Sequence, residues 1–232
     1  MLSRALAEPD IDHEVWWATT DALRERGGAA VWDAAAALRD RPDPLERYFA
    51  AEVLRIIVLF DESDEAPLEG PLLDLFLPWV TSETDPRVIW SLTAGLADSM
   101  DPRAQVPLPE LMRHVDGKAR VRALSGFYSR IESGDPAALD AAMKCTRDED
   151  PEVRRYACLI LGTAPAHARK VSDSLASCLT DPDEGVRVHA AGRLALRDDP
   201  RGEHILRTLD PTDEDSPYHW LLHDVSRHRH GR

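Results

Sequence analysis

The chain has 232 residues, 43% of them hydrophobic and 30% charged, which is enough apolar material to bury a core in one large or two small domains. Its 28 Lys and Arg stand against 42 Asp and Glu, and the resulting formal net charge of −14 disfavours binding to a phosphate backbone. There is no run of about 18 apolar residues that could span a bilayer. The opening MLSRALAEPDIDHEV also lacks the apolar core of a secretory signal, so we expect a cytoplasmic protein.

The net charge indicates which kind of partner the chain would bind, and the cysteines indicate whether it holds disulfides or a metal or redox site. So acidic a chain would attract a protein with a basic face, and its richness in Ala, Arg and Asp is typical of GC-rich bacteria. The three cysteines, Cys145, Cys158 and Cys178, are odd in number and widely spaced, which indicates neither a disulfide framework nor a CxxC site. We therefore expect buried thiols and no cofactor.

One short pattern recurs along the chain. In DPEVRRYACLIL, taking Val153 as position zero, an Asp lies three residues before it, an Arg one after, a small residue four after and a large apolar residue eight after. The other zero positions of this repeat frame are Val15, Glu46, Val88, Ala119 and Val186. Their spacings along the chain are 31, 42, 31, 34 and 33 residues, and the one long gap holds an acidic insert, DESDEAPLEGP at 61–71. The repeat therefore runs through most of the chain.

Each copy of the frame predicts a helix. Positions zero, four and eight fall on one helical face, and the preceding Asp, often followed by Pro, is typical of a capped helix start. The frame begins at Asp12, Asp43, Asp85, Asp116, Asp150 and Asp183, and apolar-periodic stretches precede its last five copies at 29–38, 71–80, 106–115, 136–145 and 170–179. We predict an all-α solenoid of about six stacked helix pairs, because one pair alone cannot bury its apolar stripe.

The DPxVRxxAxxxL frame resembles the HEAT repeat, in particular the compact bacterial type also found in phycobilin lyases. The resemblance covers roughly residues 10–210, which leaves 211–232 as a C-terminal cap and basic tail of a single solenoid over 1–232. It implies that the arginine at position one pairs with aspartates of its own or the next unit. These arginines would be Arg47, Arg120, Arg154 and Arg187, with Asp43, Asp85, Asp116, Asp150 and Asp183 as partners. Trp16 and Ile89 replace the arginine in two copies.

The resemblance also implies that the helices with the frame line a concave face, into which positions two, six and nine would point. Position two carries an aromatic row in the first three units. Trp, Tyr and Arg are enriched at the energetic centres of protein interfaces. The candidate partner-binding residues are Trp17, Tyr48, Trp90, Arg24, Arg55, Arg155 and Tyr156. The alternative is that these aromatic side chains pack between neighbouring helices.

Catalytic motifs are missing from the sequence. It contains no GxSxG, GxGxxG, GxxxxGK[ST] or HExxH. The sequence therefore lacks the motifs of nucleophile-elbow hydrolases, dinucleotide-binding enzymes, P-loop NTPases and zincin metalloproteases. The best metal candidate is HWLLH, in which His219 and His223 share one helical face beside Asp224. With no third ligand in view, the pattern is more typical of a solvated helix, and we expect no metal.

We therefore expect a non-catalytic scaffold or regulator that binds another protein through its concave face. One alternative resembles the alkylpurine DNA glycosylases, with Trp17, Tyr48 and Trp90 near Asp21 or Glu52 forming a pocket for a cationic base. A bilin-lyase activity is suggested only by the kinship of the repeat. The net charge opposes the first alternative, and no residue pattern marks a bilin site.

The acidic composition predicts poor binding to nucleic acid. Duplex DNA at physiological salt should bind no more tightly than a Kd of about 10⁻⁴ M, and the purified protein should release no base from alkylated DNA. A filter-binding titration at two salt concentrations measures this directly. Micromolar binding that falls steeply with salt would contradict the expectation and favour the glycosylase-like alternative.

Overall fold

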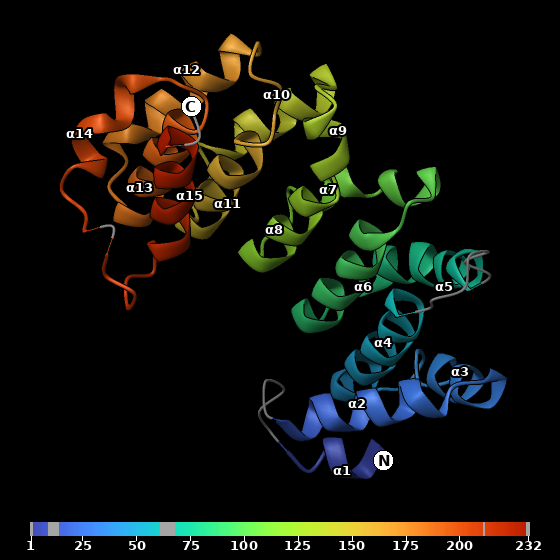
Figure 1. The fold of residues 1–232 in the computed structure, drawn as a ribbon. Helices are drawn as coiled ribbons and strands as arrows, with labels where there is room; N and C mark the ends of the chain where they lie inside the picture. The colour runs from blue at the N-terminus through green and yellow to red at the C-terminus, as the bar shows by residue number, and fades with distance from the viewer. Residues whose placement is uncertain (1, 9–13, 61–67, 211, 231–232) are drawn as a thin grey trace. The chain divides into compact units, whose positions relative to one another are not determined.

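The computed structural model describes residues 2–8, 14–60, 68–210 and 212–230, and all regular secondary structure within these ranges is helical (Figure 1). The all-α repeat fold predicted from the sequence is confirmed. The chain divides into two compact units, unit 1 over residues 1–126 and unit 2 over residues 127–232. Each unit stacks helix pairs made of an outer helix followed by an inner helix that carries the repeat frame.

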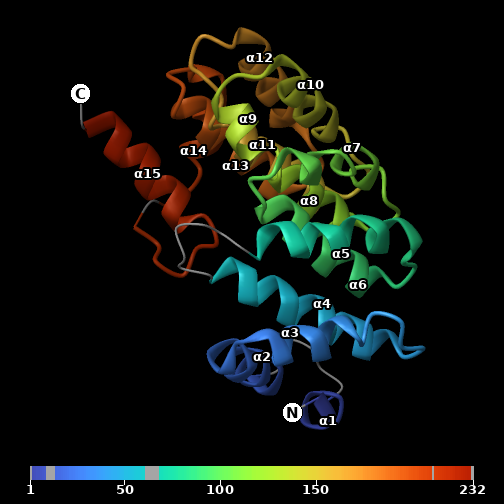
Figure 2. The same cartoon turned by 90° about the vertical axis from the view of Figure 1, so that its right-hand side faces the viewer.

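Unit 1 holds the first four copies of the frame. Its inner helices pack against one another in chain order: α2 (Glu14–Arg26), α4 (Pro44–Leu59), α6 (Pro86–Asp98) and α8 (Gly117–Ser125). The outer helices pack on the inner helices that follow them: α3 (Ala29–Ala36), α5 (Glu69–Ser82) and α7 (Leu108–Leu111). The 3₁₀ helix η1 (Pro102–Gln105) packs on α5, α6 and α7. Figure 2 shows the succession of layers from α2 and α3 through α4 to α5 and α6. The short α1 (Leu2–Ala5) packs on α2.

Unit 2 holds the last two copies. The inner helices are α11 (Pro151–Leu161) and α13 (Glu184–Ala195), and the outer helices are α10 (Pro136–Cys145) and α12 (Arg169–Ser177), which continues into η2 (Cys178–Thr180). The remaining elements are α9 (Tyr128–Glu132), η3 (Pro200–Gly202), α14 (Glu203–Leu206) and α15 (His219–His230). Helices α14 and α15 pack on α13, where Leu206, Leu222 and Val225 form a cluster with Ala191.

Aspartate caps fix where five of the inner helices begin. The capping carboxylates accept a hydrogen bond from a backbone N–H two or three residues on, at 2.8–3.0 Å, and belong to Asp43, Asp85, Asp116, Asp150 and Asp183. In three of these helices Pro follows the cap, where its missing N–H is not needed. The equivalent Asp12 of the first copy lies outside the described residues.

The predicted core positions are buried in the last four copies of the frame, whereas Val15, Leu23 and Glu46 of the first two copies are only partly buried. In α11, Val153, Ala157 and Leu161 have no solvent exposure, and the corresponding residues of α13 repeat the pattern. The thiols of Cys145, Cys158 and Cys178 are buried too, as their spacing indicated. The spacing of four residues therefore places one continuous apolar stripe on each inner helix against its neighbours.

Two of the arginines at position one, Arg47 and Arg154, join successive units, but through a different carboxylate from the one that the resemblance implied. Arg154 donates from Nε and Nη2 to the two carboxylate oxygens of Asp181, each at 2.8 Å, and Arg47 reaches both oxygens of Glu83 at 2.9 Å. The predicted partners Asp85 and Asp183 lie two residues further on and act as caps instead. The carboxylate five residues before position zero therefore accepts the arginine, and the one three residues before it caps the helix.

The same arginines also close their own loops. In each case Nη1 donates to two carbonyl oxygens, six and five residues earlier in the chain. These pairs are Arg41 and Pro42 for Arg47, His114 and Val115 for Arg120, Asp148 and Glu149 for Arg154, and Asp181 and Pro182 for Arg187. One guanidinium thus holds the loop before its helix and, in Arg47 and Arg154, the loop of the next unit.

The Glu83 carboxylate shows how strongly this junction is bonded. Burial raises the pKa of Glu83, but hydrogen bonds from Arg47, from the backbone N–H groups of Asp85 and Thr84 and from the Trp79 indole outweigh burial and hold the pKa at about 2. The carboxylate is therefore ionised over the whole physiological range.

Removing the Arg154 side chain should lower the free energy of unfolding by about 1 to 3 kcal/mol, because the Asp181 carboxylate and two loop carbonyls lose their donor. Urea denaturation of Arg154→Ala measures the change. As a control, Arg207→Ala removes an exposed guanidinium that pairs with Glu203 on the surface, and should change stability by no more than about 0.5 kcal/mol. An Arg154→Ala variant as stable as the parent would remove the structural role of this residue.

The depressed pKa of Glu83 predicts an acid-sensitive junction. A carboxyl group whose pKa is lower in the folded than in the unfolded chain stabilises the fold above its unfolded pKa of about 4.3, and this contribution is lost as pH falls towards about 2. The stability difference between the parent and Glu83→Gln should therefore shrink between about pH 5 and pH 3 in urea unfolding. The exposed Glu132→Gln serves as control, and a difference that stays constant with pH would contradict the prediction.

Candidate protein-binding surface

The predicted aromatic row does not form one continuous surface. Trp17 on α2 is 59% exposed, whereas Tyr48 on α4 is only 7% exposed and lies 5.5 Å, ring to ring, from the buried Trp16. Trp90 on α6 is partly buried, and the Arg122 guanidinium of α8 lies 5.1 Å from its ring. The expectation of an exposed side chain is therefore wrong for Tyr48, which packs between helices because Trp16 replaces the arginine of the frame.

Around Trp17 a mixed aromatic and charged surface is exposed in unit 1. Asp21, one turn after Trp17, accepts a hydrogen bond at 2.7 Å from Arg24, whose guanidinium lies 5.2 Å from the centre of the Phe60 ring. Phe60, at the end of α4, is 58% exposed. We call Trp17, Asp21, Arg24 and Phe60 the Trp17 surface. The Asp21 pair and the Phe60 ring orient the Arg24 side chain at this surface.

Arg55 does not belong to an exposed face. It is 6% exposed and pairs at 3.0 Å with Glu52, which is itself 5% exposed and accepts a hydrogen bond from Ser91 of α6 at 2.6 Å. A further contact at 3.5 Å joins Arg55 to Asp98. Burial lowers the pKa of Arg55, and the Glu52 carboxylate more than restores it, so the guanidinium stays charged. Instead of an exposed binding position, Arg55 forms a buried ion pair with Glu52 within α4, and Ser91 and Asp98 connect this pair to α6.

In unit 2 the predicted Arg155 and Tyr156 lie on α11 and are both partly exposed. Arg155 donates from Nε to the Glu152 carboxylate at 3.2 Å, one turn earlier on the same helix. On α13, Arg193 lies against Gly162, and its Nε has no hydrogen-bond partner among the described residues. Burial lowers the pKa of Arg193, while the carboxylate of Asp224 acts against this shift. At position two of the frame, α11 therefore carries Arg155, where α2 of unit 1 carries the exposed Trp17.

Two exposed aromatic residues escaped the repeat pattern. Phe60 follows the last core position of α4, and Trp220 lies on α15, which carries no copy of the frame. Both are more than half exposed. Phe60 precedes the acidic insert at 61–71, and a large aromatic residue next to a charged loop was the only sequence signal for its exposure. The part of this insert at 61–67 lies outside the described residues.

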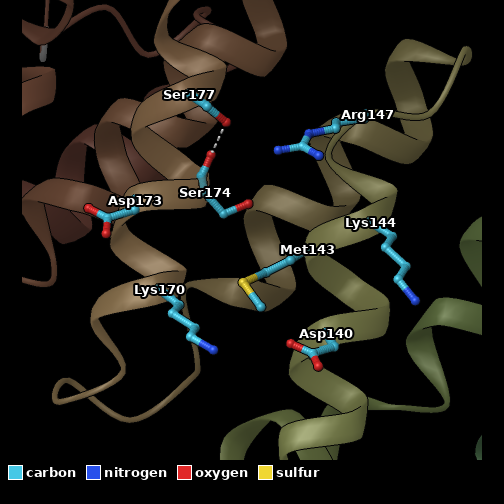
Figure 3. Close-up of a pocket in the computed structure, with 8 residues that line it drawn as sticks. All are labelled: Asp140, Met143, Lys144, Arg147, Lys170, Asp173, Ser174 and Ser177. Carbon is cyan, nitrogen blue, oxygen red and sulfur yellow. Dashed lines mark hydrogen bonds between the residues drawn. The ribbon is translucent and has the colours of Figure 1, made fainter.

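Hydroxyl groups in the hollows of the structure are engaged in structural hydrogen bonds. A hollow of about 420 Å³ lies between α10 and α12, with Arg147 and Lys170 on its rim and Met143 between them (Figure 3). There Ser177 donates to the carbonyl oxygen of Ser174 at 2.6 Å, and Ser174 lies 3.3 Å from the Thr146 hydroxyl. The first contact lies within α12 and the second joins α12 to the end of α10, and neither provides an activated nucleophile.

A second hollow, of about 210 Å³ in unit 1, contains a serine bonded to a carboxylate. Ser99 donates to Glu69 Oε1 at 2.5 Å, but the same oxygen accepts the backbone N–H groups of Met100 and Asp101 at 2.8 and 3.2 Å. Glu69 thus ties down the loop after α6. All three donors belong to the loop that follows α6, so this pair is arranged for structure.

The HWLLH motif lies on α15. His223 is exposed, and the His219 and His223 rings flank the Trp220 ring at 5.2 and 6.2 Å. No three of the described His, Cys, Asp and Glu side chains lie close enough together to hold a metal ion. Among the described helices, none combines the length and apolar character needed to cross a membrane.

The comparisons with known proteins agree with this architecture. A family model described as HEAT repeats matches residues 107–193 and, in a second overlapping match, residues 136–218. These matches hold the last three copies of the frame. None of the curated proteins matches the chain.

Solved structures extend the likeness to the rest of the fold. YibA from Escherichia coli is similar over 98% of this chain and 79% of its own, with a TM-score of 0.68 at 14% sequence identity. An engineered protein is similar over 98% of this chain and 66% of its own, with a TM-score of 0.52 at 22% identity. At such low identities the likeness is one of fold.

Proposed function

Since the chain carries HEAT repeats, we propose that it is a non-catalytic scaffold that binds a protein partner through the Trp17 surface. The observation that carries this proposal is the exposure of Trp17 beside Trp16, which is fully packed against α4. A repeat protein of this kind presents one helix face after another, and such surfaces are suited to binding other polypeptides.

The exposed area of the Trp17 ring determines how much free energy its burial can contribute to association. A tryptophan side chain buries roughly 200 Å² when covered, so a ring that is 59% exposed leaves on the order of 120 Å² of largely apolar area in water. At about 25 cal/mol per Å², covering it would contribute about 3 kcal/mol to association. Phe60 adds a second ring of similar exposure, so the Trp17 surface holds two anchors typical of interface centres.

Charge favours a basic partner. Residues 1–126 include 13 Lys and Arg against 23 Asp and Glu, so unit 1 carries most of the negative charge of the chain. Exposed Glu14 lies one turn before Trp17, and exposed Asp21 lies one turn after it. Acidic residues around an apolar anchor steer a basic segment toward it and speed association at low salt.

The proposal excludes a reaction because the polar groups that could supply one are used elsewhere. Ser99 and Glu69 fasten a loop, and Ser91 donates to a Glu52 carboxylate that is already paired with Arg55. A catalytic hydroxyl needs a base that is free to take its proton. These serine–carboxylate contacts are better explained by the packing of the repeats.

Photo-crosslinking tests the proposal in the source cells. A benzoylphenylalanine placed at Trp17 or Phe60 should crosslink one protein species, and the same residue at Val115, an exposed position of unit 1, should not. Trp17→Ala should weaken binding of the purified species by about 2 kcal/mol or more. The melting temperature of the Trp17→Ala variant should remain close to that of the parent, because the Trp17 ring is not part of the core.

Matched variants separate binding from folding. Trp220→Ala removes an even more exposed tryptophan from α15 and should leave binding unchanged. Tyr48→Ala removes a buried ring and should cost about 3 to 5 kcal/mol of folding stability. Equal crosslinking at Trp17 and Val115, or crosslinking to nucleic acid alone, would contradict the proposed function.

A further inference from the structure

Unit 1 contains an apolar hollow that the proposed scaffold function does not use. It measures about 510 Å³ and lies between α2, α3 and α4, with a floor of four buried side chains: Val31, Ala35, Phe49 and Val53. We call it the α3 hollow. Its volume falls within the range of about 300 to 1,000 Å³ that is usual for small-molecule sites.

The hollow is open because the α3 side chains that face it are small. Ala30 and Ala34 lie on its rim, one turn apart, and both are exposed. Before α3 the chain turns at Gly27 and Gly28, whose φ values of 55° and 79° favour glycine, so no side chain enters from this loop. Larger residues on α3 would fill the space, as Leu or Phe do in other outer helices of the chain.

Unit 2 shows what faces the same surface elsewhere in the repeat. Counted back from position zero, Ala30 and Ala34 correspond to Lys170 and Ser174 of α12, which face the preceding outer helix α10 (Figure 3). Where unit 2 has Lys170 and Ser174, α3 has only Ala30 and Ala34, and its apolar face is open at the hollow.

Size distinguishes between the possible occupants. A helix about 10 Å across that rises 1.5 Å per residue takes up roughly 120 Å³ per residue, so a hollow of about 510 Å³ holds only about one helical turn. A docked partner helix would lie mostly outside it. A single hydrocarbon chain would fill it and meet apolar walls on three sides.

One charged group defines the polar end of the ligand. Arg26, at the end of α2, is the one ionisable side chain of the lining, is exposed, and has no ion pair among the described residues. Among the described residues that line the hollow, Arg26 alone is charged, so its guanidinium sets the charge preference at the rim. A carboxylate is the planar group that a guanidinium binds best, with two hydrogen bonds.

We infer that the α3 hollow binds a monocarboxylate with a linear apolar tail, with the tail on the Val31 and Phe49 floor and the carboxylate at Arg26. This site is separate from the Trp17 surface, which lies on a different face of α2. The ligand class follows from apolar walls of limited volume with one unpaired cation at the opening.

A fluorescent fatty acid tests the inference on the whole protein. Dansyl-labelled undecanoic acid should brighten and shift to the blue on binding, and decanoate should displace it. Ala34→Leu places a larger side chain in the hollow at an exposed helical position, and should weaken probe binding about tenfold or more. Ala137→Leu makes the same change at an exposed alanine of α10 and should leave probe binding unchanged.

The charge preference is tested separately. Decanol should compete less well than decanoate, and Arg26→Gln should weaken decanoate binding about two- to fivefold, the range for an exposed ion pair, without affecting decanol. Absence of probe binding, or binding that Ala34→Leu leaves intact, would overturn the site. Equal competition by decanol and decanoate, unchanged in Arg26→Gln, would overturn the carboxylate assignment. Each of these outcomes leaves the crosslinking test of the Trp17 surface untouched.

Discussion

At two junctions of the repeat, a position-one arginine makes a bidentate contact with a carboxylate of the next unit. Arg154 binds the Asp181 carboxylate and two carbonyls of its own loop, so one planar group fixes both ends of a repeat junction. Five donors in a rigid fork suit this role, because a lysine could not reach the carboxylate and the carbonyls with the same geometry. The Asp183 cap can then start α13 at a fixed residue, and the apolar stripe of α13 meets that of α11 in register.

The sequence predicted the parts of the fold that depend on local chemistry. A capping aspartate and apolar residues at positions zero, four and eight determine where an inner helix begins and which face it buries, as in α11 with Asp150, Val153 and Leu161. The acidic partner of the arginine was misassigned, because the frame contains two carboxylates two residues apart. Only the loop geometry decides that Asp181 accepts the arginine while Asp183 caps the helix.

The candidate site was predicted less well, since exposure depends on neighbouring helices. Position two of α4 points at the side of α2 where Trp16 replaces the arginine, and the two aromatic rings of Trp16 and Tyr48 bury each other. Position nine of the same helix buries Arg55, because Glu52 lies within reach on α4 and Ser91 of α6 holds that carboxylate. Helical periodicity gives the direction of a side chain around its own axis. It does not say how closely the next helix approaches.

Trp16 and Trp17 are neighbours in the chain, yet Trp16 packs in the core and Trp17 is exposed to solvent. They are about 100° apart on α2, so when one ring enters the contact with α4 the other must point away from it. A free tryptophan on a surface invites non-specific association, and charge around it limits this. The exposed Glu14 and Asp21 give α2 this protection and would repel a second acidic copy. The same charges attract a basic segment, so the surface that resists self-association is selective for a partner of opposite charge.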